Sequence, residues 1–171
     1  MTAFVAPDPA RRRREAAAPG GVLLATDLGP ASTTATDRAL DLAARLDVPL
    51  LVVSVIDMRR LRLPSGQFSA RVDQVRSRRE VSAQELAQRC RGRGVAVRFL
   101  VWEGDPGESI VEAAAAEGAE LIVVGTHGRG NVGRLVMGSV SEYVLRHATC
   151  PVVVVRPTGD RGLEPESGSA A

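Results

Sequence analysis

The stretch ELIVVGTHGRGNVGRLVMGS, residues 120–139, decides the fold class of this chain. It opens with an apolar, β-branched run of strand length and continues through a glycine-rich loop into SVSE, residues 139–142, a capping-box pattern. We predict a strand over residues 120–125 and a helix from Ser139 to about residue 147. A strand, a loop and a helix in succession are half of a βαβ unit, the building block of parallel α/β sheets.

The same alternation of short apolar runs and helical patterns continues on both sides of this stretch. Further strands are predicted over residues 21–26, 50–56, 95–102 and 151–155, and helices over about 32–46, 68–91 and 109–117, the first capped by Ser32. Because crossovers between parallel strands are right-handed, the helices cover both faces of the sheet. The sequence predicts an α/β fold, a three-layer doubly wound sandwich with five parallel strands.

Ligands of such sheets bind beyond the carboxyl ends of the strands. The predicted strands end at Asp27, Asp57, Glu103 and Gly125, so three carboxylates and the glycine loop gather at one edge. Carboxylates are common at strand ends, and we predict no metal site here. We also predict no zinc site at Cys150 and its neighbour His147, because the further ligands are lacking.

Composition excludes several kinds of chemistry. The 171 residues carry a net charge of +2, and all 22 basic residues are arginines, so lysine-based catalysis and the lysine of a P-loop are excluded. With this small charge and 3% aromatic residues we expect no nucleic-acid partner. No apolar run is long enough for a signal or a membrane span, which predicts a cytoplasmic protein without membrane contact.

One folded domain is expected over residues 21–157, between two polar tails. Residues 1–20 are rich in Arg, Pro and Ala, and residues 158–171 are polar with Gly, Pro and Ser, so both tails are predicted to be disordered. The four consecutive arginines at residues 11–14 are interpreted as part of a solvated arm, with contact to an anionic partner as the alternative.

Three overlapping glycine patterns occur in the loop. Residues 128–133 spell GxGxxG, but a dinucleotide fingerprint belongs in the first βα turn, with an acidic residue about 20 positions later. Residues 133–139 have P-loop spacing without the lysine that reaches the β and γ phosphates. The third pattern, Gly125-x2-Gly128-x9-Gly138-Ser139, fits best. It leaves a strand tightly and returns at a helix N-terminus, whose free amides and dipole form an anion site, with Arg129 and Arg134 as sources of charge.

The third pattern continues as VSEYVLRHATCPVVVVR to residue 156 and resembles the ATP-binding branch of the universal stress protein family. Three further segments support the resemblance: VLLATD ending at Asp27, VID ending at Asp57, and the tripeptide Gly-Asp-Pro at residues 104–106. The resemblance covers residues 21–156. The chain departs from the family in its first turn, where DLGPAS, residues 27–32, replaces the commoner Asp-Gly-Ser type of spelling. The resemblance implies strand order 3-2-1-4-5 and a homodimer formed through the last strand, Val152–Val155.

The resemblance also implies an ATP site, with Mg²⁺ carried on the phosphates. Asp27 and the backbone around Val55 would hold the adenine and the ribose, and the glycine motif would line the phosphate path. The implied binding residues are Thr26, Asp27, Val55, Val124, Gly125, Thr126, His127, Gly128, Arg129, Gly138, Ser139 and Val140. We predict no catalytic residue, because His127 has no identifiable partner acid or nucleophile and Ser139 lacks a nucleophile elbow.

Two classes of function remain open. In the first, the protein is a stress-response regulator or sensor that binds ATP and hydrolyses it slowly at most. In the second, it is an enzyme that hydrolyses an adenine nucleotide, although the adenylation signatures of such enzymes do not occur in the chain. A dimeric scaffold that binds no nucleotide is a weaker alternative, because the glycine spacing is intact. The sequence favours the ATP-binding regulator.

Overall fold

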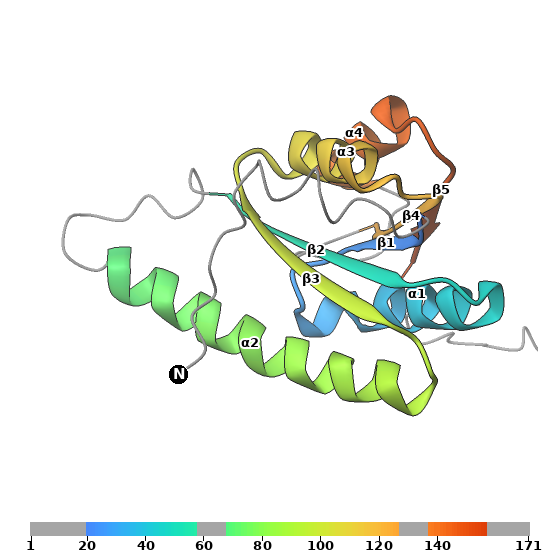
Figure 1. Ribbon diagram of the computed structural model, residues 1–171. Coiled ribbons are helices and arrows are strands. Elements are labelled where there is room, and N and C mark those ends of the chain that lie inside the picture. Colours follow the sequence, from blue (N-terminus) through green and yellow to red (C-terminus); the bar gives the residue numbers. More distant parts are fainter. Residues whose placement is uncertain (1–19, 58–67, 127–136, 157–171) are drawn as a thin grey trace, which may run out of the picture.

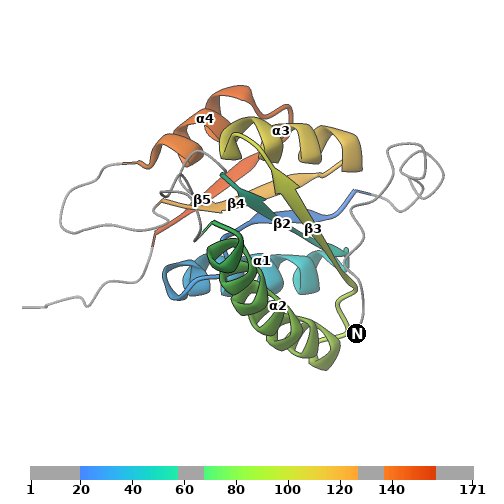
Figure 2. The same ribbon diagram turned by 90° about the vertical axis from the view of Figure 1, so that its left-hand side faces the viewer.

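The computed structural model describes residues 20–57, 68–126 and 137–156. In this part of the chain, five parallel strands form one sheet in the order β3-β2-β1-β4-β5 (Figure 1). Helices α1 and α2 cover one face, and α3 and α4 cover the other (Figure 2). The predicted three-layer doubly wound fold, with strand order 3-2-1-4-5, is confirmed.

The elements alternate between strand and helix along the whole domain. The strands are β1 (Val22–Ala25), β2 (Leu50–Ile56), β3 (Val97–Glu103), β4 (Leu121–Gly125) and β5 (Val152–Val155). The helices are the 3-10 turn η1 (Pro30–Ser32), α1 (Thr33–Leu46), α2 (Phe68–Gly92), α3 (Pro106–Glu117) and α4 (Ser139–His147).

β1 is the central strand, and all four of its residues are buried. Successive strand residues point to opposite faces of a sheet. Val22 and Leu24 pack in the core under α1 and α2, whereas Leu23 and Ala25 pack in the core under α3 and α4. A strand covered on both faces has no place for an exposed polar side chain, which explains the unbroken apolar run.

The long helix α2 is held to the domain by the apolar face of its last turns. Leu86 and Cys90 are buried in the core that α2 shares with α1. The ion pairs Arg89–Asp37 and Arg93–Asp41 join the same two helices at their exposed sides. Exposed ion pairs contribute about 0–1 kcal/mol each, against about 1.5–3 kcal/mol for a buried leucine side chain. Apolar burial therefore dominates the attachment of α2.

Two element ends differ from the prediction for identifiable reasons. β3 begins two residues late, at Val97, because the backbone N–H of Val95 bonds the Cys90 carbonyl at 3.0 Å and closes the end of α2. α3 begins at Pro106, because the Asp105 side chain accepts bonds from the Gly107 and Glu108 amides and caps the helix. Apart from Gly20, the predicted tails, residues 1–20 and 158–171, lie outside the described residues.

Candidate functional site

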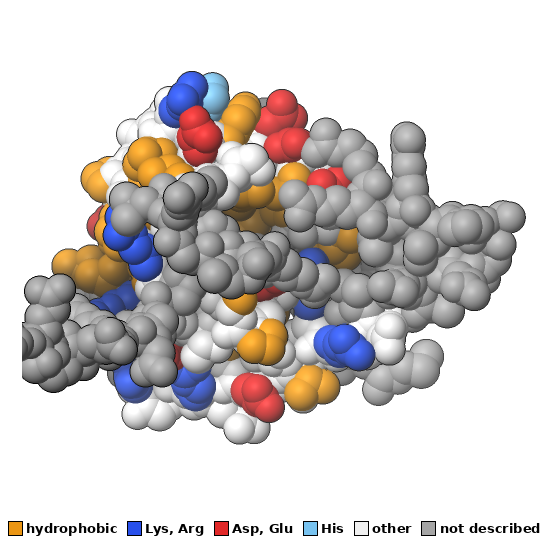
Figure 3. All heavy atoms as spheres, turned by 180° about the vertical axis from the view of Figure 1, so that it is seen from behind, with side chains coloured by type: hydrophobic (Ala, Val, Ile, Leu, Met, Phe, Trp, Pro, Cys, Tyr) orange, Lys and Arg blue, Asp and Glu red, His pale blue; other side chains and the backbone are white. Residues whose placement is uncertain are grey.

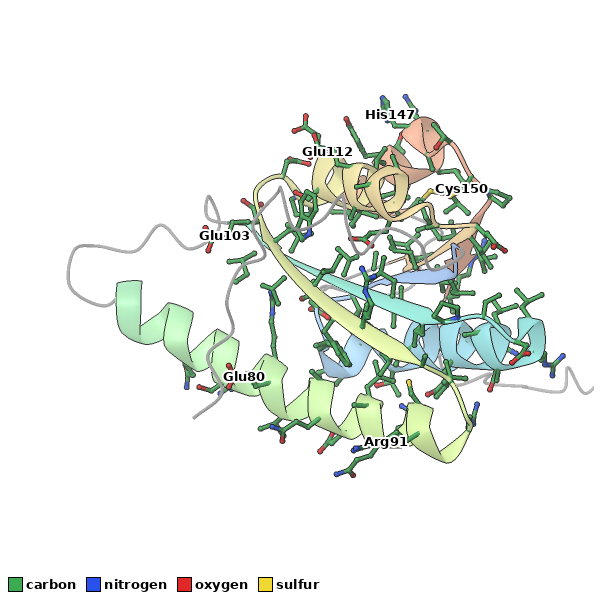
Figure 4. All side chains as sticks on the ribbon, in the orientation of Figure 1. Glu80, Arg91, Glu103, Glu112, His147 and Cys150 are labelled. Carbon is green, nitrogen blue, oxygen red and sulfur yellow. The ribbon has the colours of Figure 1, made fainter. Side chains whose placement is uncertain are left out.

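The carboxyl ends of the strands meet at one edge of the sheet, as predicted. Glu103 lies at this edge at the end of β3, and Cys150 lies beside the opposite edge, before β5 (Figure 4). The register pairs Ala25 with Val53 on one side and with Val124 on the other. Two residues further along each strand are Val55, Asp27 and Thr126. Three of the predicted site residues therefore lie side by side at the carboxyl ends of β2, β1 and β4: Val55 is the penultimate residue of β2, and Asp27 and Thr126 follow β1 and β4.

Asp27 has its carboxylate fixed by its own turn. Oδ1 accepts the backbone N–H of Gly29 at 2.9 Å and the hydroxyl of Ser32 at 2.6 Å. A Cβ on Gly29 would lie 3.0 Å from Oδ1, so glycine gives the carboxylate room to lie over the turn. Oδ2 has no hydrogen-bond partner among the described residues. The half-buried carboxylate thus keeps one oriented oxygen able to accept bonds from a ligand.

Ser32 does not cap α1 as the sequence predicts. It is the residue before α1, but its φ of −90° and ψ of −3° are helical and its side chain makes no capping bond. The hydroxyl instead donates to Asp27. The prediction was wrong because η1 winds the chain into the helix and leaves the hydroxyl facing the strand end. Ser32 and Gly29 are site residues that the sequence reasoning missed, and Asp-x-Gly as an Asx-turn pattern was the available signal.

The unusual first turn places a leucine in a left-handed backbone conformation. Leu28 has a φ of +56°, which costs a residue with a Cβ roughly 1–2 kcal/mol. Its amide donates to the hydroxyl of Thr26 at 2.9 Å, and its side chain packs against the core under α1 and α2. The turn is therefore held by the hydrogen bond to Thr26 and by the packing of the Leu28 side chain. Thr26 contributes to the site by positioning this turn.

Thr126 joins the end of β4 to the start of α4. Its amide donates to the Val155 carbonyl at 2.9 Å, and its carbonyl accepts the amide of Gly138 at 2.9 Å. A Cβ on Gly138 would lie 2.8 Å from the Thr126 carbonyl oxygen, closer than real Cβ atoms come. Gly138 is thus required by the close approach of two backbone segments, which brings the N-terminus of α4 beside the end of β4.

The N-terminus of α4 forms where the sequence predicts, without the predicted capping box. Gly138 is the residue before the helix and makes no side-chain cap, and the hydroxyl of Ser141 donates to the Gly138 carbonyl at 2.8 Å. Glu142 pairs with Arg146 instead of reaching back. The first amides of a helix have no intrahelical acceptor. Those of Ser139 and Val140 are therefore available to an anion, and the exposure of Ser139 keeps the site accessible.

The middle of the predicted phosphate path lies outside the described residues. This applies to His127, Gly128 and Arg129, and also to Arg134. Their roles stay predictions. Val124 is buried inside β4, so that its contribution to a site is to hold the strand end, and Gly125 ends the strand half-buried.

The two cysteines and the remaining histidine lie away from this edge. Burial raises the pKa of the Cys90 thiol, against the opposing effect of Arg89 and Arg93, and burial also raises the pKa of Cys150. The His147 ring stacks on Tyr143, and its Nδ1 donates to the Tyr143 carbonyl at 2.8 Å. The His147 side chain is exposed at the end of α4, on the outside of the molecule (Figure 4).

The described ranges, residues 20–57, 68–126 and 137–156, contain no group of three His, Cys, Asp or Glu side chains placed to hold a metal ion. They also contain no helix with both the length and the apolar character needed to traverse a bilayer.

Comparison with known proteins assigns the fold to a family. The model of the universal stress protein family matches residues 21–156. This chain belongs to the universal stress protein family. A universal stress protein of Methanocaldococcus jannaschii is 29% identical over 137 residues, which cover 79% of this chain and 81% of that protein. One of Mycobacterium tuberculosis is 38% identical over 141 residues, 79% of this chain and 45% of that longer protein.

Solved structures of universal stress proteins share the fold. A family member from Burkholderia pseudomallei has a TM-score of 0.64 at 35% identity, covering 79% of this chain and 95% of that one. A universal stress protein in complex with cAMP has a TM-score of 0.58 at 24% identity, covering 82% and 98%. One from Archaeoglobus fulgidus in complex with dAMP has a TM-score of 0.58 at 21% identity, covering 79% and 96%.

Proposed function

We propose that this universal stress protein binds ATP at the carboxyl edge of its sheet and acts as a cytoplasmic stress-response regulator. The observation that carries the proposal is the alignment of Val55, Asp27 and Thr126 at the carboxyl ends of three adjacent strands. Neighbouring strands lie about 4.8 Å apart, so the three positions span about 10 Å. This matches the distance from a base through a ribose to the first phosphate of a nucleotide.

Val55, Asp27 and the start of α4, which Thr126 holds beside β4, each supply the chemistry that one part of the nucleotide needs. The backbone edge of Val55 offers hydrogen bonds to a base, and the open Oδ2 of Asp27 accepts bonds from ribose hydroxyls. The amides of Ser139 and Val140, with the positive end of the α4 dipole, attract phosphates. His127, Gly128 and Arg129 complete the proposed phosphate path. The adenine nucleotides bound by two structural relatives, cAMP and dAMP, support the ligand class.

The proposal includes Mg²⁺ as an ion carried by the phosphates. Mg²⁺ keeps several waters and needs one or two carboxylates at most when phosphates supply oxygens. Hydrolysis is proposed to be slow at most. Asp27 is already committed to its own turn through Oδ1, and no general base is identified within the part of the chain that the structure describes. The regulatory signal is then a conformational change on ATP binding, which is transmitted between the subunits.

We further propose that the protein is a homodimer formed through β5. In the described sheet β5 is an edge strand that pairs with β4, and Val153 on it is 36% exposed. Leu145 on α4 is also exposed, and hydrophobic side chains are visible at the surface on this side of the molecule (Figure 3). An edge strand with exposed apolar side chains pairs readily with a second copy. Sedimentation analysis of wild type and Val153→Arg tests this, because the charge should shift the dimer to monomer.

The experiment that tests the nucleotide site is calorimetric titration with ATP, with and without Mg²⁺, followed by an assay of the same sample for ADP. Inorganic triphosphate is the matched control, because it lacks the base and ribose. Saturable ATP binding, tighter than that of triphosphate and with negligible ADP, is the expected result. Rapid ADP formation would support a nucleotide hydrolase instead. Absence of binding would leave the dimeric scaffold.

A further inference from the structure

Arg79 of α2 reaches the backbone of β2 across the carboxyl edge of the sheet. Its two terminal nitrogens lie 3.5 and 3.4 Å from the carbonyl oxygen of Val55. No pattern in the sequence singles out this arginine, which lies 24 residues from Val55 in a helix that carries several other arginines. The contact matters because Val55 is a member of the proposed nucleotide site, on which the inference below depends.

The Val55 backbone points toward the space beyond the end of β1. Pairing of β1 with β2 ends at Ala25 and Val53, followed by a bond from the Thr26 amide to the Val53 carbonyl. Alternate residues of a strand direct their backbone groups to the same edge. The carbonyl of Ile56 takes the Gly104 amide on the β3 side. Val55, like Val53, therefore presents its C=O and N–H on the β1 side, where β1 has already ended.

The backbone edge of Val55 matches one class of base, and its carbonyl already accepts a hydrogen bond from Arg79. An amide edge with one acceptor and one donor matches a 6-aminopurine, whose exocyclic amino group donates while its ring nitrogen accepts. A 6-oxopurine offers an acceptor in place of the amino group. The guanidinium of arginine is always charged and carries donors alone. It therefore competes with an amino group for the Val55 carbonyl and leaves an oxo group able to accept from the arginine.

We propose that Arg79 determines base selectivity in this site by occupying the Val55 carbonyl until the exocyclic amino group of a 6-aminopurine displaces it. The long contact distances make the bond weak, so displacement costs little. Arg79 thus lowers the affinity for ATP. It also lowers the ratio of the ITP dissociation constant to the ATP dissociation constant, ITP being the 6-oxo analogue of ATP.

The direction in which ATP affinity changes when Arg79 is replaced distinguishes competition with the base from simple charge attraction. Removing a positive charge near a bound triphosphate weakens ATP binding through Coulomb attraction alone. If Arg79 competes with the base, Arg79→Met has the opposite effect and tightens ATP binding roughly threefold to tenfold, as for removal of one weak competing hydrogen bond. ITP bound in the same register places its 6-oxo group, an acceptor, at the vacated carbonyl, so its affinity should not increase.

The experiment is calorimetric titration of wild type, Arg79→Met and Arg78→Met with ATP and with ITP. Arg78 is the adjacent, exposed arginine, so Arg78→Met loses the same charge without touching Val55. Circular dichroism and thermal unfolding establish that the variants are folded. The expected result is tighter ATP binding in Arg79→Met alone, with the ratio of the ITP and ATP dissociation constants raised by a similar factor.

The outcomes that overturn the inference differ from those that overturn the proposed function. Equal ATP affinity in wild type and Arg79→Met, or weaker binding in Arg79→Met, refutes competition while leaving the nucleotide site intact. An equal gain for ITP refutes selectivity. If none of the three proteins binds ATP, the proposed function fails, and the inference fails with it. If Arg79→Met binds ATP and wild type does not, both are supported.

Discussion

The amide of Gly138 donates to the carbonyl of Thr126 at 2.9 Å, and the glycine has no space for a Cβ. This contact fixes the start of α4 at the end of β4. The φ of −68° and ψ of 151° at Gly138 are accessible to any residue, so the requirement for glycine is steric. A motif position that the resemblance implies for phosphate contact therefore also has a structural role, in the packing of the start of α4 against the end of β4.

Gly138→Ala is expected to destabilise the protein by about 1–3 kcal/mol, because the new Cβ meets a backbone oxygen at 2.8 Å and the segment must shift. Displacement of the α4 amides should also weaken ATP binding. Urea unfolding and ATP titration measure the two effects. Gly92→Ala is the matched control, because a Cβ at this helix end meets nothing within 4 Å. A Gly138→Ala protein as stable as wild type would contradict the steric role.

Asp27→Asn is expected to weaken ATP binding roughly tenfold while leaving the fold nearly unchanged. The amide oxygen of asparagine can still accept from Gly29 and Ser32, so the turn is kept. The expected loss of ATP affinity comes from weaker hydrogen bonds between the ribose hydroxyls and a side-chain oxygen that is no longer charged. Titration with ATP tests this against Asp47→Asn, an exposed residue with a φ of 55° that asparagine tolerates. Unchanged ATP affinity in Asp27→Asn would remove Asp27 from the site.

The attachment of α2 gives a test of apolar burial against ion pairing. Leu86 is 2% exposed, and Leu86→Ala is expected to cost about 2–5 kcal/mol. Asp37→Asn, which breaks the exposed pair with Arg89, should cost less than about 1 kcal/mol and lose its effect in 1 M salt, where screening is strong. Urea unfolding at low and high salt measures both. A larger loss of stability for Asp37→Asn than for Leu86→Ala would mean that ion pairing, and not apolar burial, dominates the attachment of α2.

The two thiols should differ in reactivity. Cys90 is 0% exposed and should resist a maleimide in the folded protein, whereas the half-buried Cys150 should react slowly and faster as pH rises. Burial raises both pKa values, so the reactive thiolate is scarcer at neutral pH than for a free cysteine. Mass spectrometry with and without denaturant counts the adducts. Labelling of native Cys150→Ser protein would contradict the burial of Cys90.

The raised pKa of Cys90 also gives the sign of a stability change at alkaline pH. The unfolded thiol ionises first, so the contribution of Cys90 to stability is complete below the unfolded pKa. It is lost as pH rises through the folded pKa. Wild type should therefore lose stability across this window faster than Cys90→Ala, as followed by urea unfolding. Parallel pH profiles of the two proteins would count against this linkage.

The sequence determined the fold and the place of the candidate site. Unbroken apolar runs of strand length, helical spacing and right-handed crossovers lead to one doubly wound sheet, and they place Asp27 and Gly125 at its carboxyl edge. These signals are local, because each depends on neighbours along the chain. The glycine spacing was enough to predict where α4 starts.

The tertiary structure decided which partner each polar group has, because most of those partners come from separate elements. Ser32 bonds Asp27 instead of capping α1, and Gly138 is required by the Thr126 carbonyl. Arg79 contacts Val55 from another layer of the molecule. Such contacts depend on the distance between strand ends and helices after packing, which no pattern along the chain encodes. Periodicity specifies which face of an element is buried, and only packing specifies what that face meets.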